Sequence, residues 1–379
     1  MKIHRIFILI TMIFMEFGCS STKKNILKET LVSDDPKIKN VMSNPEAFEL
    51  QIIYTQIYRD KNNKVSFKDF NYHLDAENYF YPASTIKFPI AILALEKLNT
   101  IDKTSKDTQY IIEGKPEKLR FSEEIAKVFA VSDNEASTNL LEFAGFDYVN
   151  ESMAVKGLAP FKLSHRLSSS NPGDPKTKAV TLYRDDAKIV NLPAYTNKSN
   201  VALKLNKLKK GVSYLKNGEL VKEPFDFSNK NYYPLETLHN TMKRIVFPEA
   251  FKESERFKIS EKDREFILFS MQNLPKNAGY DSVKYPDGYC KFFLFGDTKE
   301  NIPTSIKIYN KVGNAYGTLI DCAYIVDVEN KIEFIVSATI LVNKDNIFND
   351  NIYEYDTVGL PFLGELGRQL YAKNLKKAK

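Results

Sequence analysis

The chain has 379 residues and 43% of them are hydrophobic, so it can bury a sizeable core and is not a disordered protein. The formal net charge is +6, but the lysines are scattered among acidic residues, which indicates a solvated surface and argues against nucleic acid as a partner. The four histidines have no metal-ligand spacing, and neither a metal nor another cofactor is expected.

Residues 1–18 have the pattern of a secretory signal peptide. Lys2 and Arg5 precede an almost wholly apolar run over 6–14, which is too short to be a permanent membrane span. Cys19 follows a small residue and precedes a polar stretch, which resembles a bacterial lipoprotein processing site, although Glu16 stands where an aliphatic residue is usual. We therefore expect an exported cell-envelope protein that faces the periplasm and is anchored to a membrane through Cys19 and a tether over 19–33. A plain cleaved signal peptide and an uncleaved anchor are the alternatives.

The rest of the chain, 34–379, is expected to form one domain with two lobes. Alternating apolar and polar residues predict a strand hairpin over 48–59 and 64–74. Helices are expected over 34–43, 81–98, 122–130, 134–143, 235–245 and 261–274, and a long loop over 164–180. Three strands, over 304–312, 318–328 and 331–342, and a helix over 359–377 end the chain. This order predicts an antiparallel sheet lobe from about 34–80 and 300–379, with a helical lobe inserted over about 81–299.

Two further features have an open interpretation. The lysine-rich segment over about 195–230 is predicted to be a surface insertion, with a polyanion site as the alternative. Cys290 and Cys322 could pair in an exported protein, but their spacing does not establish that they are close, and we interpret them as structural.

The stretch Tyr81-Pro82-Ala83-Ser84-Thr85-Ile86-Lys87 opens a predicted helix whose residues are apolar on most faces, as expected for a helix that is buried on several sides. Ser84 and Lys87 are three residues apart, so their polar ends can meet on one face of the helix. A lysine can remove the proton of a serine hydroxyl if burial or a nearby cation lowers its pKa. The alternative is a helix-capping serine beside an ordinary lysine.

Two later motifs bear on this choice. Ser132-Asp133-Asn134 lies between two predicted helices, where it could also serve only as a helix cap. Lys311-Val312-Gly313 lies at the end of a predicted strand and is followed by Asn314, where it could also be an ordinary β-turn.

In this order the three motifs resemble the penicillin-recognising serine enzymes, which are class A β-lactamases and the DD-peptidases called penicillin-binding proteins. The resemblance is close at the first two motifs and looser at 311–313, where the family usually has Lys-Thr-Gly. As an order of elements it extends over about 45–379. It implies an α/β (α+β) fold of the β-lactamase and transpeptidase type, in which an antiparallel five-stranded sheet is flanked by helices and carries an inserted all-helical lobe.

The resemblance also implies roles for these residues. Ser84 would be the nucleophile, Lys87 the proton acceptor, and Ser132 the group that passes the proton to the leaving nitrogen. Substrate binding would fall to Asn134, Lys311, Gly313 and Asn314, and the N–H groups of Ser84 and Asn314 would form the oxyanion hole. Lys311 would also help to lower the pKa of Lys87, because two buried cations disfavour each other's charge.

The chain departs from the class A pattern in two places. The loop of that class carries a glutamate that activates water for deacylation, but no carboxylate stands between Arg166 and Asn171, and the nearest acid is Asp174. Val312 lacks a hydroxyl that family members use on the substrate carboxylate, which would weaken substrate binding by about 1.5–3 kcal/mol.

Three functions are therefore open. The first is a monomeric serine hydrolase that forms an acyl-enzyme at Ser84 and hydrolyses β-lactams, with inefficient deacylation. The second is a DD-peptidase-like enzyme that acts on peptidoglycan stem peptides. The third is a non-catalytic lipoprotein that binds cell-wall fragments.

Overall fold

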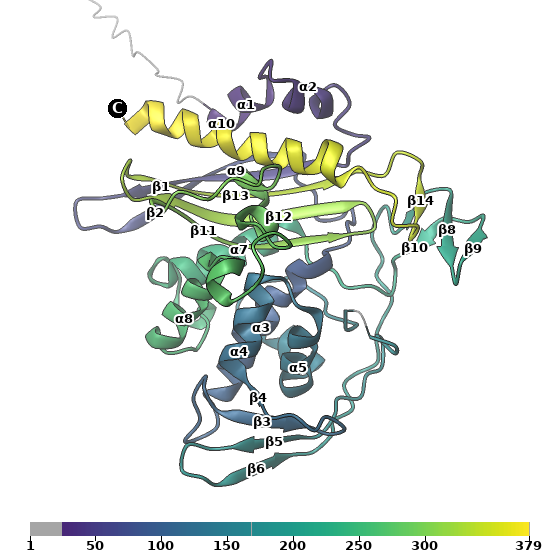
Figure 1. The fold of residues 1–379 in the computed structure, drawn as a ribbon, viewed down its shortest axis with the longest axis vertical. Coiled ribbons are helices and arrows are strands. Elements are labelled where there is room, and N and C mark those ends of the chain that lie inside the picture. The colour runs from purple at the N-terminus through teal and green to yellow at the C-terminus, as the bar shows by residue number, and fades with distance from the viewer. Residues whose placement is uncertain (1–24, 168, 379) are drawn as a thin grey trace, which may run out of the picture.

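The computed structural model describes residues 25–167 and 169–378. The expected signal peptide and Cys19 lie outside the described residues. Figure 1 shows a sheet near the top of the molecule, a long helix above it, and a larger lobe below it that consists mainly of helices. Of the helices in the described part of the chain, none combines the length and apolar character that a bilayer-spanning segment needs.

The central sheet has five strands that come from both ends of the described chain. Its spatial order is β11-β12-β13-β1-β2, and every neighbouring pair is antiparallel, which confirms the predicted sheet. The strands are β1 (Gln51–Arg59), β2 (Val65–Tyr72), β11 (Ile306–Ala315), β12 (Thr318–Asp327) and β13 (Ile332–Leu341).

Successive side chains of these strands point to opposite faces of the sheet, and each face packs against its own hydrophobic core. On β1, Ile52 and Tyr54 pack in the core beneath the C-terminal helix, whereas Ile53 packs in the core of the lower lobe. Cys322 belongs to the second of these cores and Cys290 to the first. Both cysteines are buried and free, so they do not form the disulfide that their spacing left open.

Helices from both ends of the described chain, together with the short helix α9, cover the upper face. They are α1 (Ile26–Leu31), α2 (Pro36–Met42), α9 (Phe292–Phe295) and α10 (Leu360–Ala378). Ile26, Leu27 and Leu31 are buried in the same core as the inner face of α10. The tether expected over 19–33 is therefore too long at its C-terminal end, because α1 carries apolar side chains that pack into the domain.

The lower lobe is organised around α3 (Lys87–Leu98), in which every residue except Lys97 is buried. Its other α-helices are α4 (Phe121–Ala130), α5 (Asn134–Ala144), α6 (Phe146–Val155), α7 (Leu235–Val246) and α8 (Glu261–Gln272). Short 3₁₀ turns are η1 (Ala83–Ile86), η2 (Pro248–Ala250), η3 (Glu253–Glu255), η4 (Pro275–Ala278) and η5 (Asp287–Cys290), and a π turn, η6 (Tyr355–Gly359), precedes α10.

The expectation of an all-helical lobe is wrong. A four-stranded antiparallel sheet lies at the bottom of the lobe in Figure 1, formed by β4 (Leu119–Arg120), β3 (Gln109–Ile112), β5 (Val180–Tyr183) and β6 (Ile189–Leu192). These strands have four residues or fewer, and β3 pairs with β5 from a distant part of the chain, with Ile112 opposite Val180. Local alternation is too short to reveal such a pairing.

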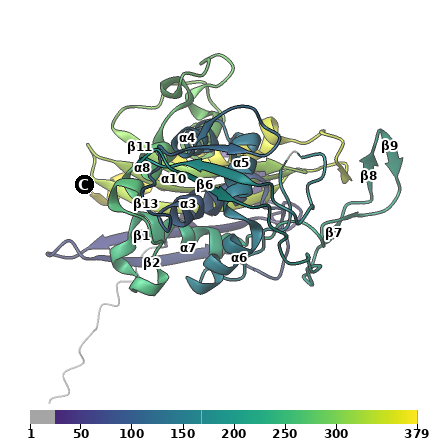
Figure 2. The same cartoon turned by 90° about the horizontal axis from the view of Figure 1, so that it is seen from below.

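The lysine-rich segment also contains strands, which are β7 (Lys209–Lys210), β8 (Ser213–Lys216), β9 (Glu219–Val221) and β10 (Phe225–Asp226). In Figure 2 the β8–β9 hairpin projects from one side of the molecule. β8 pairs in parallel with β14 (Ile347–Phe348), which follows the central sheet. The segment is therefore attached to the sheet lobe and is not only a surface excursion.

Candidate active site

Ser84 lies at the entrance to the buried helix α3, in the turn η1. It is half-buried, whereas Lys87, one turn later, is 0% exposed. Strand β11 presses against this turn at Gly313, where an added Cβ would lie 2.9 Å from both the carbonyl oxygen of Pro82 and the backbone nitrogen of Ser84. Glycine is therefore required for the close approach of β11 to the backbone of Ser84.

Lys87 is a buried amine with polar partners from the turn between α4 and α5. Its Nζ donates to the carbonyl oxygen of Ser132 and to Oδ1 of Asn134, both at 2.5 Å, and lies 3.4 Å from Oγ of Ser132. Burial lowers the pKa of Lys87 well below its ordinary value, and the nearby charge of Lys311 lowers it further. A larger fraction of Lys87 is therefore neutral near pH 7 than for an exposed lysine.

Ser132 is presented to this amine by an unusual backbone conformation. Its φ of +57° is in the left-handed region, which places the turn between α4 and α5 under local strain. The next residue, Asp133, caps α5 by accepting a hydrogen bond from the backbone N–H of Ala136 at 2.8 Å. The helix-cap reading of this motif thus holds for Asp133, while Ser132 and Asn134 contact Lys87.

Lys311 reaches the same hydroxyl from the sheet. Its Nζ donates to Oγ of Ser132 and to the carbonyl oxygen of Val312, both at 2.8 Å. Burial lowers the pKa of Lys311 to about 8. The Ser132 hydroxyl therefore lies between two buried amines that are 224 positions apart in the sequence numbering (311 − 87).

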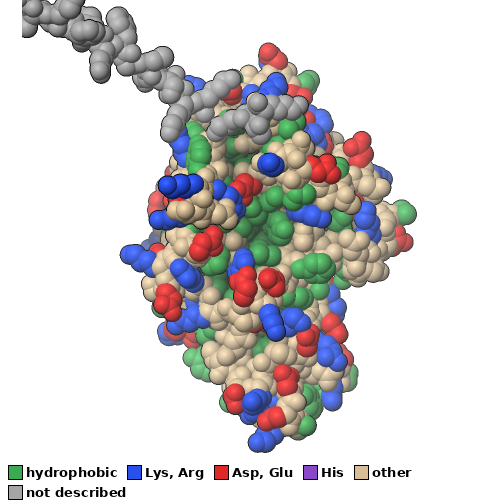
Figure 3. All heavy atoms as spheres, turned by 90° about the vertical axis from the view of Figure 1, so that its left-hand side faces the viewer, with side chains coloured by type: hydrophobic (Ala, Val, Ile, Leu, Met, Phe, Trp, Pro, Cys, Tyr) green, Lys and Arg blue, Asp and Glu red, His purple; other side chains and the backbone are tan. Residues whose placement is uncertain are grey.

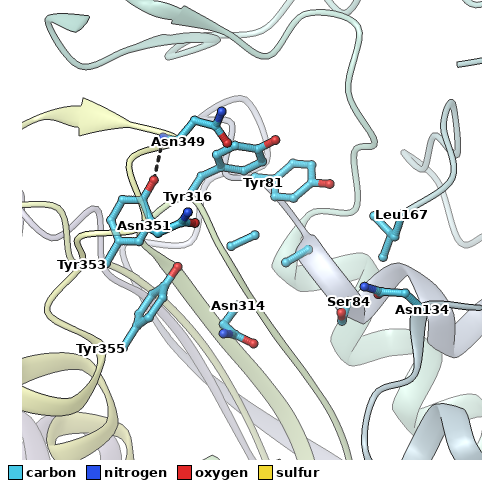
Figure 4. Close-up of a pocket in the computed structure, with 12 residues that line it drawn as sticks. Tyr81, Ser84, Asn134, Leu167, Asn314, Tyr316, Asn349, Asn351, Tyr353 and Tyr355 are labelled. Carbon is cyan, nitrogen blue, oxygen red and sulfur yellow. Dashed lines mark hydrogen bonds between the residues drawn. The ribbon is translucent and has the colours of Figure 1, made fainter. Parts of the chain in front are cut away.

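Ser84, Asn134 and Asn314 line one cavity of about 390 Å³. Lys87 and Lys311 are buried behind this lining, where both contact Ser132. Figure 4 shows Ser84 and Asn134 at one end of the cavity, Asn314 near the middle, and tyrosines at the other end. The structure thus brings together every residue expected at the site within the described chain. Val312, by contrast, packs in the core beneath α10 at 3% exposure.

The comparisons with known proteins agree with this geometry. A model of the "Beta-lactamase enzyme family" matches residues 35–211, which include Ser84, Lys87 and Ser132. Over residues 35–211 the chain is therefore similar to this family. The motifs and the family together make the protein a serine hydrolase of the β-lactamase and transpeptidase superfamily. No curated protein sequence matches the chain significantly.

Solved β-lactamases share the fold at low sequence identity. A β-lactamase from Francisella tularensis is 13% identical with a TM-score of 0.52, and the match covers 94% of this chain and 100% of that chain. One from Sphaerobacter thermophilus DSM 20745 is 11% identical with a TM-score of 0.51, and covers 92% and 96% of the two chains. One from Burkholderia vietnamiensis is 10% identical with a TM-score of 0.51, and covers 93% and 99%.

The loop after α6, which was compared above with the glutamate-bearing loop of class A β-lactamases, is held in place by Arg166. Arg166 donates through Nε to Oε1 of Glu142 on α5 at 2.6 Å, and both side chains are buried. The same guanidinium donates to the carbonyl oxygens of Asp174 at 2.6 Å and Lys176 at 2.8 Å. Sequence reasoning missed Glu142, because nothing in α5 distinguishes this glutamate from a surface residue.

Asp174 does not border the cavity of Ser84. Its carboxylate accepts a hydrogen bond from the backbone N–H of Lys176 at 2.9 Å, and it lines a separate cavity with Glu142 and Arg166. Leu167 is the loop residue that faces Ser84, and no Asp or Glu is among the described residues that line the Ser84 cavity. Asp174 therefore stabilises the loop and is not placed to activate water at Ser84.

The remaining cavity wall was not expected from the sequence. It consists of uncharged aromatic and amide side chains, which are Tyr81, Tyr316, Asn349, Asn351, Tyr353 and Tyr355. Elsewhere, on the face shown in Figure 3, basic and acidic side chains are interspersed around a hollow lined by hydrophobic ones. Within 25–167 and 169–378, no three His, Cys, Asp or Glu side chains cluster as metal ligands.

Proposed function

We propose that the protein opens the amide bond of β-lactams by forming an acyl-enzyme at Ser84 and hydrolyses that acyl-enzyme slowly. In this reaction Oγ of Ser84 attacks the lactam carbonyl while neutral Lys87 accepts its proton. The N–H groups of Ser84 and Asn314 stabilise the oxyanion, and the contact at Gly313 supports this role because it brings β11 against the backbone of Ser84.

Collapse of the tetrahedral intermediate breaks the C–N bond, and the leaving nitrogen needs a proton. Ser132 is suited to deliver it, because its hydroxyl contacts both Lys87 and Lys311. Ser132 donates its proton to the nitrogen and is reprotonated from Lys87, which restores the resting state. The position of this hydroxyl between two buried amines is the single observation that carries the proposal.

Binding of the substrate is assigned to the cationic end of β11. Lys311 offers its ammonium to the substrate carboxylate, and Asn134 offers its amide to the acyl side chain. Because Val312 packs in the core and has no hydroxyl, the carboxylate lacks one partner that related enzymes supply. We expect weak substrate affinity as a consequence.

Slow hydrolysis of the acyl-enzyme follows from the lining of the cavity. Attack of water on the ester needs a general base, and the described lining residues include no carboxylate. The same observation favours a second function, a DD-peptidase-like acyl transfer on peptidoglycan stem peptides, in which an amine can attack the ester in place of activated water.

The decisive experiment incubates the purified protein with a chromogenic cephalosporin. It measures turnover by the colour change and adduct formation by the intact mass of the protein. Slow turnover with a transient adduct, both lost in Ser84→Ala, is the expected result. A stable adduct without turnover supports the DD-peptidase-like function. The absence of both adduct and turnover overturns acylation and leaves a non-catalytic binding protein.

We also propose that the protein is exported and anchored in the cell envelope through a lipid on Cys19. The support is the signal-like sequence over 1–18 and the small residue before Cys19. Labelled fatty acid should enter the wild-type protein and not Cys19→Ser. Equal labelling of the two proteins would refute the anchor.

A further inference from the structure

The cleft of Ser84 continues over a surface whose side chains have no role in the proposed acylation step, although the backbone N–H of one member, Asn314, is assigned to the oxyanion hole. This surface, which we call the tyrosine–asparagine wall, comes mainly from the C-terminal end of β11 with the turn after it, and from the segment that leads from β14 into η6. In Figure 4 it lies across the cavity from Asn134. Besides Tyr81, its members are Asn314, Tyr316, Asn349, Asn351, Tyr353 and Tyr355.

The lysine-rich segment fixes the position of this wall. β8 pairs with β14, and Asn349 donates through Nδ2 to the carbonyl oxygen of Leu215 at 2.9 Å. Gly211 packs so closely that an added Cβ would lie 2.4 Å from the carbonyl oxygen of Asn346. The lysine-rich segment therefore supports one side of the cleft through these backbone and side-chain contacts.

Contacts between tilted and edge-to-face aromatic rings extend from the lysine-rich segment towards the nucleophile. The ring centroids of Phe225 and Tyr316 are 5.1 Å apart, and those of Tyr316 and Tyr81 are also 5.1 Å apart. Tyr81 lies three residues before Ser84 and is buried. Such contacts hold the rings of the wall in fixed orientations before any ligand arrives.

The polar groups of the wall can bind a neutral ligand. The hydroxyl of Tyr353 accepts a hydrogen bond from the backbone N–H of Asn349 at 2.7 Å, and that of Tyr355 accepts one from Gly317 at 2.9 Å. Each phenol therefore keeps its own hydrogen to donate. The side chains of Asn314 and Asn351 are exposed, and each amide offers both donors and an acceptor.

We propose that the tyrosine–asparagine wall is a subsite for an uncharged sugar that carries an acetamido group, as part of the acyl donor that Ser84 attacks. Ring faces match the apolar C–H faces of a sugar, and side-chain amides match its hydroxyl and acetamido groups. No Lys, Arg, Asp or Glu is among the described residues of the cavity lining, so a charged group in this part of the cleft would lack a counter-charge. This assignment rests on the proposed function, since it names the substrate class of the same site.

The test measures sugar binding separately from acylation. The probe is tri-N-acetylchitotriose, and saturation-transfer NMR with Ser84→Ala protein reports which protons of the sugar touch the wall. We expect transfer to the acetamido methyl groups. The double variant Tyr353→Ala/Asn351→Ala should weaken binding by about tenfold or more, and Tyr353→Phe, which keeps the ring, by less.

Tyr195→Ala is the matched control, because Tyr195 is 54% exposed and lies outside the cavity lining. Far-UV circular dichroism checks that each variant is folded. Unchanged binding in the folded double variant, or equal binding of maltotriose, overturns the assignment. Binding of an uncharged acyl-D-alanyl-D-alanine amide in place of the sugar assigns the wall to a peptide and also overturns it.

The sugar experiment and the acylation experiment fail independently. Sugar binding without any acylation of wild-type protein would refute the proposed function and support the wall as a binding site. Acylation without sugar binding would refute only the sugar subsite.

Discussion

The two sides of the Ser84 cavity differ in the side chains that lie close to the nucleophile. On the side of β11 and α5, two buried amines contact one serine hydroxyl, and burial lowers the pKa of both. On the side of the loop after α6, an arginine and a glutamate pair with each other below the surface, and Leu167 is what faces the nucleophile. The first side has groups that can transfer a proton, whereas the second has a buried ion pair that stabilises the loop.

In the proposed reaction, this difference separates formation of the acyl-enzyme from its hydrolysis. The groups assigned to ester formation come from α3, the turn before α5, and β11. The loop is held by Arg166 and Glu142 and supplies no carboxylate to the described lining of the cavity. The predictions below test each side in turn.

The largest effect is expected on the amine side. Lys87→Met should slow acylation by roughly a hundredfold to ten-thousandfold at pH 7, because it removes the proton acceptor while keeping the site filled. The rate of adduct formation, followed by intact mass, measures this. Lys97→Met is the control on the same helix, since Lys97 contacts carbonyl oxygens of Phe143 and Ala144 and not the cavity. An acylation rate in Lys87→Met equal to wild type would remove Lys87 as the base.

On the loop side, Glu142→Gln should lower the free energy of unfolding by about 3–5 kcal/mol, because Arg166 would remain buried without its carboxylate. Urea denaturation measures the change. Glu135→Gln on the same helix is the control, because that carboxylate is 71% exposed in its pair with Lys115 and should matter by about 1 kcal/mol or less. A similar decrease in the free energy of unfolding in both variants would show that the buried pair stabilises the fold no more than the exposed pair does.

A gain of function should follow when the loop receives an acid. Leu167→Glu places a carboxylate in the lining of the Ser84 cavity, and we expect hydrolysis of the acyl-enzyme to accelerate by about tenfold. Decay of the adduct mass after removal of free β-lactam gives the rate. Leu167→Gln should not accelerate it. If neither variant differs from wild type, lack of an acid does not limit deacylation.

The smallest effect is a change in the pH profile. Acylation should rise with pH as Lys87 loses its proton, and fall above about pH 8 as Lys311 loses the charge that binds the substrate carboxylate. By pH 9 about a tenth of Lys311 remains charged. Lys311→Arg should move the alkaline decline upward, because a guanidinium stays protonated. A decline that stays near pH 8 in this variant would belong to another group.

Sequence reasoning was strongest where short motifs fix local chemistry. The roles predicted for Ser84, Lys87, Ser132, Asn134 and Lys311 came from three motifs and their resemblance to the penicillin-recognising enzymes, and the structure places Lys87, Ser132, Asn134 and Lys311 in contact. The central sheet was predicted from alternation in its long strands, which carry their own local signal.

Prediction from the sequence failed for features that depend on contacts between segments far apart in the chain. The pair of Glu142 with Arg166 and the pairing of β8 with β14 join segments that look ordinary by themselves. The lysine-rich segment was judged by its charge, whereas its buried aromatic Phe227 and its short strands determine where it packs. Tyr353 and Asn351 line the cleft from the segment that follows β14, whose pairing with β8 local pattern does not reveal.

The place of β1 between β2 and β13 has a consequence for biogenesis. One neighbour is made immediately after β1, but the other becomes available only when residue 341 has been synthesised. Until then, one edge of β1 exposes unpaired backbone groups beside Ile52 and Tyr54. A nascent chain that is crowded against its copies is therefore vulnerable to aggregation, and a frameshift after β12 would leave an open sheet as well as a shorter protein.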